Sequence, residues 1–307
     1  MRIGIDLGGT KIEIAALDAT GAIRLRERVA TPRGNYRETI RAIAGLVAIA
    51  DMRLGVRASV GVAIPGTISP ATGLVKNANS TALIGHPLDK DLEAAIGRPV
   101  RVANDANCFV LSEATDGAAK GADVVFGVIL GTGVGGGICI CGRVLTGAHA
   151  IAGEWGHNPL PAPNPEELPG PECYCGRRGC IEAWCSGPAM TRHFHRHTGR
   201  AWSPGEIAAA ATAHDMLAIA AMNLYLDRLA RALASIVNVL DPDVIVLGGG
   251  LSNIPALYSE LPARVERYAF APQGQTAIVR NLHGDSSGVR GAAWLWPADE
   301  DGRGRAP

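Results

Sequence analysis

The sequence predicts an α/β protein of two related lobes around a cleft. A strand, a glycine-rich tip and a second strand follow one another twice, at 3–14 and at 126–140, and such internal repetition is typical of a duplicated unit. Elsewhere, short apolar runs alternate with segments of helical periodicity. The chain has 307 residues, which is enough for two substantial hydrophobic cores. We expect the two glycine tips to face each other across the cleft.

The first lobe is predicted to span 1–117 and to be completed by a C-terminal helix at 286–297. Asn35 precedes Glu38 by three residues, a pattern that predicts a helix start, and Gly97 is expected to end a second helix. The predicted strands are 2–7, 12–16, 59–64 and 99–103, and the predicted helices run from Asn35 to at least Ala50, over 88–96, and from Asn104 to about 118.

The second lobe is predicted at 118–285, and the charged tail 298–307 is expected to be disordered. Ser203 to Glu206 is a capping box that starts a helix. The segment 216–240 predicts a long helix whose apolar stripe belongs to the core, with a dimer contact as the alternative. That stripe consists of Leu217, Leu224, Leu229, Leu233, Ile236 and Leu240. A helix is also predicted at 188–198, where His193 and His197, but not His195, share a face that we expect to be solvated.

The two glycine tips suggest phosphate binding. The first, Gly8-Gly9-Thr10-Lys11, follows Asp6; its backbone N–H groups suit an anion, and Asp6 could hold a magnesium ion through water. The alternative is an ordinary hairpin turn. The second tip, Gly131-Thr132-Gly133, follows the matching strand, and the pair is more specific than either tip alone. Neither fits the Walker or dinucleotide pattern, because a strand rather than a helix follows each tip.

The stretch 154–182 predicts a structural zinc site. Its four ligands are His157, Cys173, Cys175 and Cys180. Three thiolates and one imidazole make a closed tetrahedral set without a position for water. Glu154 and Glu182 flank these ligands, so metal binding is expected to bring two carboxylates together for a polyhydroxylated ligand, with the second ring nitrogen of His157 beside them. Buried thiols or a disulfide are the alternatives, and close spacing and the lack of an export signal weaken the disulfide.

Three further positions are ambiguous. Asp105 ends a predicted strand and begins a helix, which suits chemistry, but the position alone favours a helix N-cap. Asn79 lies in the polar segment 73–84, where its amide could bind a hydroxyl or simply make a turn. Gly248-Gly249 follows an apolar strand at 244–247 and allows close approach of a ring or ribose, although a tight strand–helix turn explains it as well.

Composition excludes several classes of function. The formal net charge is zero, so no global field attracts the chain to nucleic acid or an anionic membrane. Glycine or charge interrupts every long apolar stretch, so no membrane span is expected. The N-terminus shows no signal-peptide pattern. Seven cysteines with a predicted thiolate metal site indicate a reducing, cytoplasmic location.

The chain resembles a bacterial sugar kinase of the ROK (repressor, open reading frame, kinase) family, and within it the manno(fructo)kinases, or fructokinases. The resemblance covers nearly the whole chain. It rests on residues 6–11, Asn104-Asp105, 131–137, Glu154-x-Gly156-His157, 173–182 and 248–250. It implies an actin-like (ribonuclease H-like) duplicated ATPase fold.

The resemblance also implies ATP-dependent phosphorylation of a hexose at its 6-hydroxyl, above all D-fructose, with mannose or glucose also accepted. Asp105 would be the general base, with ATP, Mg²⁺ and structural Zn²⁺ as cofactors, in a homodimer. The implied sugar-binding residues are Gly66, Asn79, Asn104, Asp105, Glu154, His157 and Glu182. The implied nucleotide-binding residues are Gly4, Asp6, Gly8, Gly9, Thr10, Lys11, Gly131, Thr132, Gly133, Val134, Gly135, Gly136, Gly137, Gly248 and Gly249.

Three alternatives stay open. A kinase for N-acetylglucosamine or another N-acetylhexosamine, or a glucokinase, shares almost all these motifs and differs around carbon 2 of the sugar. A sugar-responsive regulator of the same family belongs to another class; here the hairpin begins at residue 2, which leaves no room for an N-terminal helix-turn-helix arm, and the intact Asp105 favours catalysis. A non-catalytic sugar-binding protein is the third alternative. The loop 161–172 indicates no role.

Overall fold

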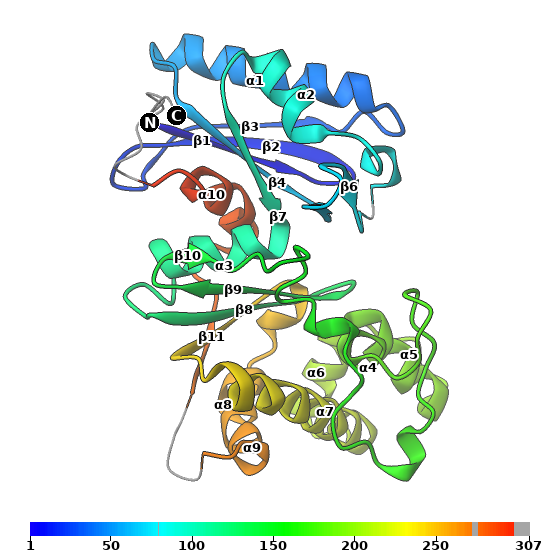
Figure 1. Cartoon of the computed structure of the whole chain (residues 1–307). Helices are drawn as coiled ribbons and strands as arrows, with labels where there is room; N and C mark the ends of the chain where they lie inside the picture. The colour runs from blue at the N-terminus through cyan, green and yellow to red at the C-terminus, as the bar shows by residue number, and fades with distance from the viewer. Residues whose placement is uncertain (79, 272–275, 298–307) are drawn as a thin grey trace. The chain divides into compact units, whose positions relative to one another are not determined.

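The computed structural model describes residues 1–78, 80–271 and 276–297 (Figure 1). These residues separate into two compact units. One holds the described residues of Met1–Lys120, Gly142–Ala152 and Asp285–Pro307, and the other holds those of Gly121–Cys141 and Gly153–Gly284. The predicted lobe boundaries at 117 and 285 stay predictions. Asn79 and the predicted disordered tail 298–307 lie outside the described residues.

Two five-stranded mixed sheets share one strand topology, with the orders β3-β2-β1-β4-β7 and β10-β9-β8-β11-β12. Both predicted hairpins are present: β1 pairs antiparallel with β2, and β8 with β9, while the later strands pair in parallel. The first sheet comprises β1 (Arg2–Leu7), β2 (Lys11–Leu17), β3 (Ile23–Ala30), β4 (Ser59–Ile64) and β7 (Val100–Asn104). The second comprises β8 (Val124–Leu130), β9 (Val134–Ile140), β10 (Arg143–Val144), β11 (Val244–Gly248) and β12 (Ala277–Arg280).

Most of the predicted helices are present. Asn35 caps the first by accepting from the backbone N–H of Glu38, and Ser203 and Glu206 form the predicted capping box. In the first unit the helices are α1 (Tyr36–Leu54), η1 (Thr81–Leu83), α2 (Leu88–Ile96), α3 (Asp105–Thr115) and α10 (Ser287–Trp294), the last preceded by η5 (Gly284–Ser286). In the second unit they are η2 (Trp155–His157), η3 (Pro165–Glu167), α4 (Ile181–Cys185), α5 (Gly187–Thr198), α6 (Pro204–Thr212), α7 (Met216–Leu240), η4 (Gly250–Asn253), α8 (Ala256–Ser259) and α9 (Leu261–Tyr268).

Some predicted boundaries were wrong. The polar segment 73–84, where no strand was predicted, contains β6 (Val75–Lys76), which pairs with β5 (Thr67–Ile68). The helix after Asn104 ends at Thr115 rather than near 118. The edge strand β3 was missed, although Ile23 and Leu25 alternate with arginines in the way that predicts a strand; most of its residues are exposed.

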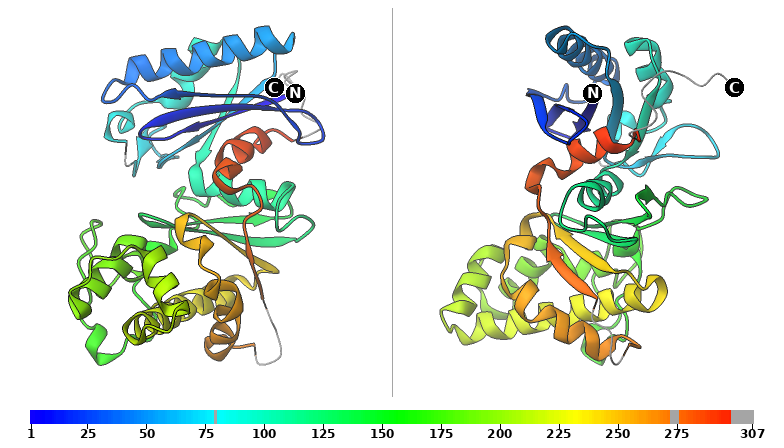
Figure 2. Two further views of the ribbon diagram at one scale, coloured as in Figure 1. Left: turned by 180° about the vertical axis from the view of Figure 1, so that it is seen from behind. Right: turned by 90° about the vertical axis from the view of Figure 1, so that its left-hand side faces the viewer.

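In the first unit, the central strand β1 separates two packed faces (Figure 2). Its isoleucines and Leu7 join the hydrophobic cluster that includes α1, whereas α10 covers the opposite face. Gly4 faces α10, and a Cβ added there would lie 1.9 Å from the carbonyl oxygen of Val289. Packing against α10 therefore leaves no room for a side chain at this position, which explains the glycine. Its predicted contact with the nucleotide stays a prediction. Since side chains alternate along a strand, Asp6 also faces α10.

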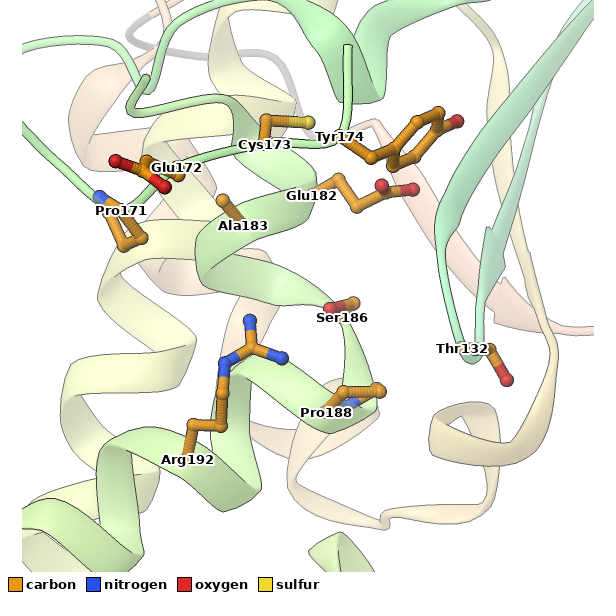
Figure 3. A pocket seen from close by; sticks show the side chains of 10 residues that line it. All are labelled: Thr132, Pro171, Glu172, Cys173, Tyr174, Glu182, Ala183, Ser186, Pro188 and Arg192. Carbon is orange, nitrogen blue, oxygen red and sulfur yellow. The ribbon is translucent and has the colours of Figure 1, made fainter. Parts of the chain in front are cut away.

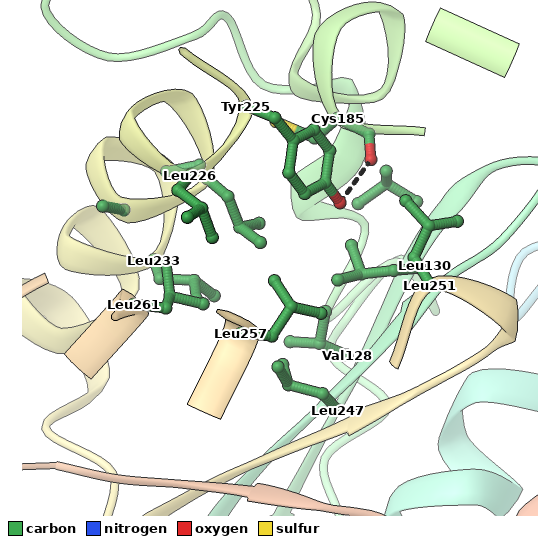
Figure 4. Packing of buried hydrophobic residues seen from close by; sticks show 14 of the residues in the cluster. Val128, Leu130, Cys185, Tyr225, Leu226, Leu233, Leu247, Leu251, Leu257 and Leu261 are labelled. Atoms are coloured by element: carbon green, nitrogen blue, oxygen red, sulfur yellow. Dashed lines mark hydrogen bonds between the residues drawn. The ribbon is translucent and has the colours of Figure 1, made fainter. Parts of the chain in front are cut away.

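In the second unit, α7 supplies much of a leucine-rich core with β8, β11 and the short helices α8 and α9 (Figure 4). The predicted apolar stripe was partly wrong: Leu217 is 48% exposed, while Met222 and Tyr225 are buried. The hydroxyl of Tyr225 donates to the carbonyl oxygen of Cys185 at 3.2 Å, which satisfies its polar tip inside the core.

Among the described residues, no single helix is long and apolar enough to cross a membrane. The pair α6 and α7, bent by 116°, passes that test of length and composition only when taken together.

Candidate functional site

Asp105 is exposed and occupies the first turn of α3, directly after β7. The N-cap is Asn104, whose side-chain oxygen accepts from the backbone N–H groups of Ala106 and Asn107 at 2.9 and 3.4 Å. The interpretation of Asp105 as the cap was therefore wrong: Asn104 is the N-cap, and Asp105 is the first helical residue and shares the N–H of Ala106 with it. The same amide donates to the carbonyl oxygen of Gly66 at 3.2 Å. Three predicted sugar-binding residues thus lie together in the first unit.

Asp6 interacts electrostatically with Asp105. Burial, and then the carboxylates of Asp105 and Glu13, together raise the pKa of Asp6 to about 6, while the charge of Lys11 opposes the shift. Glu13 lies opposite Asp6 in the β1–β2 register and accepts from Arg26 and Arg28, each at 2.7 Å. Two carboxylates within each other's field attract a divalent cation, so this end of β1 suits Mg²⁺.

The first glycine tip is a tight hairpin turn, closed by a bond from Gly8 N–H to the carbonyl oxygen of Lys11 at 3.0 Å. The Thr31 hydroxyl donates to the carbonyl oxygen of Gly8 at 2.7 Å and fixes the turn from β3. A cavity of about 200 Å³ lies beside it, lined in part by Gly9, Thr31 and Ser80. The structure therefore holds the backbone of this tip in place, and its predicted phosphate contact stays a prediction.

The second glycine tip is joined to two other segments. Gly131 N–H donates to the carbonyl oxygen of Gly133 at 3.0 Å, and the carbonyl oxygen of Gly131 accepts from the N–H of Gly187, the first residue of α5, at 2.8 Å. The backbone N–H of Val134 donates to Oε2 of Glu182 at 2.9 Å. Gly249 approaches the end of β8 closely, since a Cβ there would meet the carbonyl oxygen of Leu130 at 2.4 Å. Two predicted nucleotide-binding segments therefore lie side by side.

Gly135, Gly136 and Gly137 lie inside β9 rather than at the tip. Trp155 packs on this part of the strand, and its ring N–H donates to the carbonyl oxygen of Gly135 at 3.0 Å. The indole packs so closely on β9 that a side chain at Gly136 would collide with it, which explains a glycine there. A nucleotide contact from these three residues stays a prediction.

The four predicted metal ligands converge. One donor atom from each of His157, Cys173, Cys175 and Cys180 lies within 4.8 Å of the others. Nδ1 of His157 is 3.6 Å from Sγ of Cys173, and Sγ of Cys175 is 3.6 Å from Sγ of Cys180. Three sulfur donors and one imidazole nitrogen form the donor set that Zn²⁺ prefers. The cluster therefore fits a structural metal ion.

We expected the second ring nitrogen of His157 to contact a sugar, but in the structure it contacts another side chain. Its Nε2 lies 2.9 Å from the hydroxyl of Tyr174. Partial burial, and then the charges of Glu182 and Glu154, raise the pKa of Tyr174 to about 12. These three residues and His157 therefore form one polar group beside the cysteines. Sequence reasoning missed Tyr174, although a hydroxyl between two metal ligands was a usable signal.

A cavity of about 390 Å³ opens beside this group in the second unit (Figure 3). Glu182 and Tyr174 line one side, Thr132 of the second glycine tip another, and Arg192 reaches in from α5. The cavity offers hydroxyls, carboxylates and a guanidinium to a polar ligand. Glu154, His157 and Glu182 belong to this unit, and Asp105 to the other.

The histidines of α5 share a face as predicted, but this face is only partly solvated, since His193 is half-buried. The rings of His193 and His197 lie 4.2 Å apart on one face, and burial, with the charge of Arg228 next, lowers the pKa of His193 to about 4. Neither residue belongs to the four-ligand cluster found among the described residues.

Comparison with known proteins identifies the family. The chain matches the ROK family over residues 2–299. The chain belongs to the ROK family. It is 41% identical to the N-acetyl-D-glucosamine kinase of Salmonella gallinarum. The alignment extends over 303 residues and covers 97% of this chain and 100% of the relative. The same identity holds for the N-acetyl-D-glucosamine kinase of Salmonella paratyphi C.

Solved ROK structures share the fold. The ROK hexokinase of Thermus thermophilus is 33% identical, with a TM-score of 0.84 and coverage of 95% of this chain and 96% of the other. A ROK glucokinase of Streptomyces griseus, solved with glucose and AMPPNP, is 29% identical with a TM-score of 0.76, covering 96% and 98%. This ROK protein is therefore an ATP-dependent sugar kinase acting on a hexose, with an α/β fold consistent with the actin-like ATPases. Fructose, the sugar that the sequence favoured, is not the sugar named for these relatives.

Proposed function

We propose that this ROK kinase transfers the terminal phosphoryl group of ATP to the 6-hydroxyl of N-acetyl-D-glucosamine. The choice of sugar rests on one observation: the 41% identity to N-acetyl-D-glucosamine kinases extends along 97% of the chain. This reading replaces fructose, which we first favoured, with the alternative that shares its motifs.

Asp105 is the proposed general base. It is exposed at the first turn of α3, and its Oδ1 already accepts from the backbone N–H of Ala106 at 2.8 Å, which orients the carboxylate. In the reaction, the sugar hydroxyl loses its proton to Asp105, the new O–P bond forms, and the P–O bond to ADP breaks. A base positioned in this way contributes typically about 10²–10⁴-fold to the rate.

The proposed sugar-binding residues come from both units. The first unit contributes Gly66, Asn104 and Asp105, and the second contributes Glu154, His157 and Glu182. Asn79 stays in the proposed set on the basis of the sequence alone. His157 would act through Tyr174, whose hydroxyl it contacts. Hydrogen-bonding groups that contact a bound sugar discriminate against sugars that leave a donor or acceptor unpaired.

The nucleotide is proposed to bind through the two glycine tips and Gly248-Gly249. Asp6 would hold Mg²⁺, which neutralises the charge of the ATP phosphates when it is bound. The ligands His157, Cys173, Cys175 and Cys180 would hold Zn²⁺, which would fix the start of α4, where Glu182 lies. A homodimer stays a prediction.

The test compares initial rates on N-acetylglucosamine, glucose, mannose and fructose with magnesium and ATP, following ADP release. We expect the highest kcat/KM for N-acetylglucosamine, and the Asp105→Asn variant run in parallel controls for contaminating kinases. A higher kcat/KM for fructose would restore the first interpretation. If none of the four sugars caused ADP release, the protein would not be a kinase for any of them.

A further inference from the structure

The loop 161–172, for which the sequence indicated no role, contains a buried carboxylate. Glu167 is 4% exposed. Its Oε1 accepts from Nε of Arg228 at 2.8 Å and from a terminal nitrogen of Arg231 at 3.0 Å. Its Oε2 accepts from the backbone N–H of Asn164 at 2.9 Å and closes the capping box of η3. Both carboxylate oxygens are therefore engaged, one by α7 and one by the loop itself.

Arg231 holds the same loop at a second point. Its other terminal nitrogen donates to the carbonyl oxygens of Pro161 and Ala162 at 3.0 and 2.8 Å, and its Nε donates to Asp227 at 3.1 Å. Arg231 is 4% exposed, so these bonds are shielded from water. One guanidinium thus ties the first residues of the loop and Glu167 to α7.

Arg228 extends the network to α4. Its guanidinium carbon lies 4.1 Å from the centre of the Trp184 ring, and Trp184 follows Glu182 by two residues. The stacked cation and ring join the far end of the metal-binding stretch to the same buried carboxylate.

The network therefore spans the stretch from His157 to Glu182. Pro161 follows the metal ligand His157 by four residues, and Glu167 precedes Cys173 by six. Between these points the chain returns on itself: Leu160 N–H donates to the carbonyl oxygen of Gly179 at 2.9 Å, beside Cys180. Movement of the loop away from α7 would be transmitted to ligands on both sides.

We propose that Glu167 is a positioning residue for sugar binding, acting through Arg231 and Arg228 to hold the 161–172 loop on α7 so that the His157–cysteine cluster and Glu182 keep their places. This inference rests on the proposed function. A carboxylate suits the task because two arginines converge on it, and paired buried charges bind more strongly than neutral groups.

The test compares Glu167→Gln with Glu166→Gln, the same substitution at the exposed neighbouring residue. Zinc release to a colorimetric chelator and the KM for each substrate are measured on full-length protein. For Glu167→Gln we expect zinc release and the sugar KM to rise by roughly tenfold or more, the scale seen when a partner of a metal ligand is removed. The kcat is expected to change far less, and Glu166→Gln should match the wild type.

Equal zinc release and sugar KM in the two variants would overturn the proposal. So would a uniform loss of kcat with unchanged KM values, which indicates only a smaller folded fraction. If Glu167→Gln fails to fold, Arg231→Lys provides the same comparison, because lysine keeps the charge and loses the fork that reaches Pro161, Ala162 and Glu167. A wild type inactive on every sugar would defeat the proposed function, whereas zinc release would still test the positioning role.

Discussion

The hydroxyl of Tyr174 lies 2.9 Å from Nε2 of His157, on the side of the ring away from Cys173. If Nδ1 holds the metal ion, as its place beside Cys173 favours, Nε2 would carry the proton and donate to the tyrosine oxygen. Such outer partners fix the tautomer and orientation of a metal-bound imidazole. The contact joins the predicted metal cluster to the polar side chains of the sugar site.

Tyr174→Phe should therefore weaken zinc binding by roughly 10–100-fold, the usual cost of losing an outer partner. Competition with a chelator of known affinity measures the change. Tyr36→Phe, which removes a tyrosine hydroxyl in the other unit, should leave zinc affinity unchanged. Identical affinities for Tyr174→Phe and the wild type would show that the contact does not support the metal.

Cys175→Ser should lose zinc, because it removes one of four converging donors. Elemental analysis of the purified variant checks this, and the KM for the sugar should rise as the loop loosens. Cys141→Ser is the matched control, since Cys141 is exposed and lies outside the cluster. Full zinc content in Cys175→Ser would show that the ligand set is wrong.

Asp105→Asn should reduce kcat by about 10²–10⁴-fold, as expected for loss of a general base. Binding of the sugar, measured by calorimetry, should persist because the amide keeps the shape of the carboxylate and one of its two acceptor oxygens. Near-normal turnover would remove Asp105 from the role of base.

Gly249→Ala should raise the KM for ATP by roughly tenfold, equivalent to about 1.4 kcal/mol. Gly249 has a φ of 80°, and an added Cβ would lie 2.4 Å from the carbonyl oxygen of Leu130, so the chain must shift beside the second glycine tip. Gly250→Ala is the control, because its Cβ would have no heavy atom within 4 Å. Equal KM values for the two variants would argue against nucleotide binding here.

The stability of the wild type relative to Glu167→Gln should fall in acid. Burial alone would raise the pKa of Glu167, but bonds from Arg231, Arg228 and the backbone of Asn164 outweigh it and lower the pKa from 4.5 to about 2. A lowered folded-state pKa stabilises the protein above the unfolded value. The advantage should be full above pH 4.5 and disappear as the pH falls towards about 2.

Urea unfolding of both proteins at a series of pH values measures this difference. Asp227, His193 and Cys185 also lie near Glu167 or its arginines, but they are present in both proteins, as are the metal-binding thiols. A difference that stays constant between pH 5 and pH 3 would contradict the prediction.

Local signals predicted much of the fold. The Asn35 and Ser203 caps placed helix starts correctly because capping depends on a few neighbouring residues. The repeated hairpin was visible because both copies kept an apolar strand before the glycines. The strand β3 and the true buried face of α7 were missed, since tertiary packing, rather than local pattern, decides which apolar residues are covered.

The sequence predicted which residues belong to the candidate metal cluster better than it predicted the contacts that these residues make. The cysteine spacing was sufficient to bring four donors together in the structure. The sequence could not show that Tyr174 would occupy the second nitrogen of His157, or that Asn104 would take the cap from Asp105. It also gave no sign that Glu167 would meet two arginines some sixty residues later in the chain, at separations of 61 and 64.

Glu182 follows the predicted metal ligand Cys180 by two residues, and its carboxylate accepts from the backbone N–H of Val134 at the second glycine tip. The same carboxylate therefore contacts the backbone of the proposed ATP site and belongs to the proposed sugar-binding set. A sugar that moves this carboxylate would also move the backbone of the second glycine tip. Reciprocity then requires that sugar and nucleotide change each other's binding constant by the same factor, and Glu182 is the residue through which that shared factor would pass.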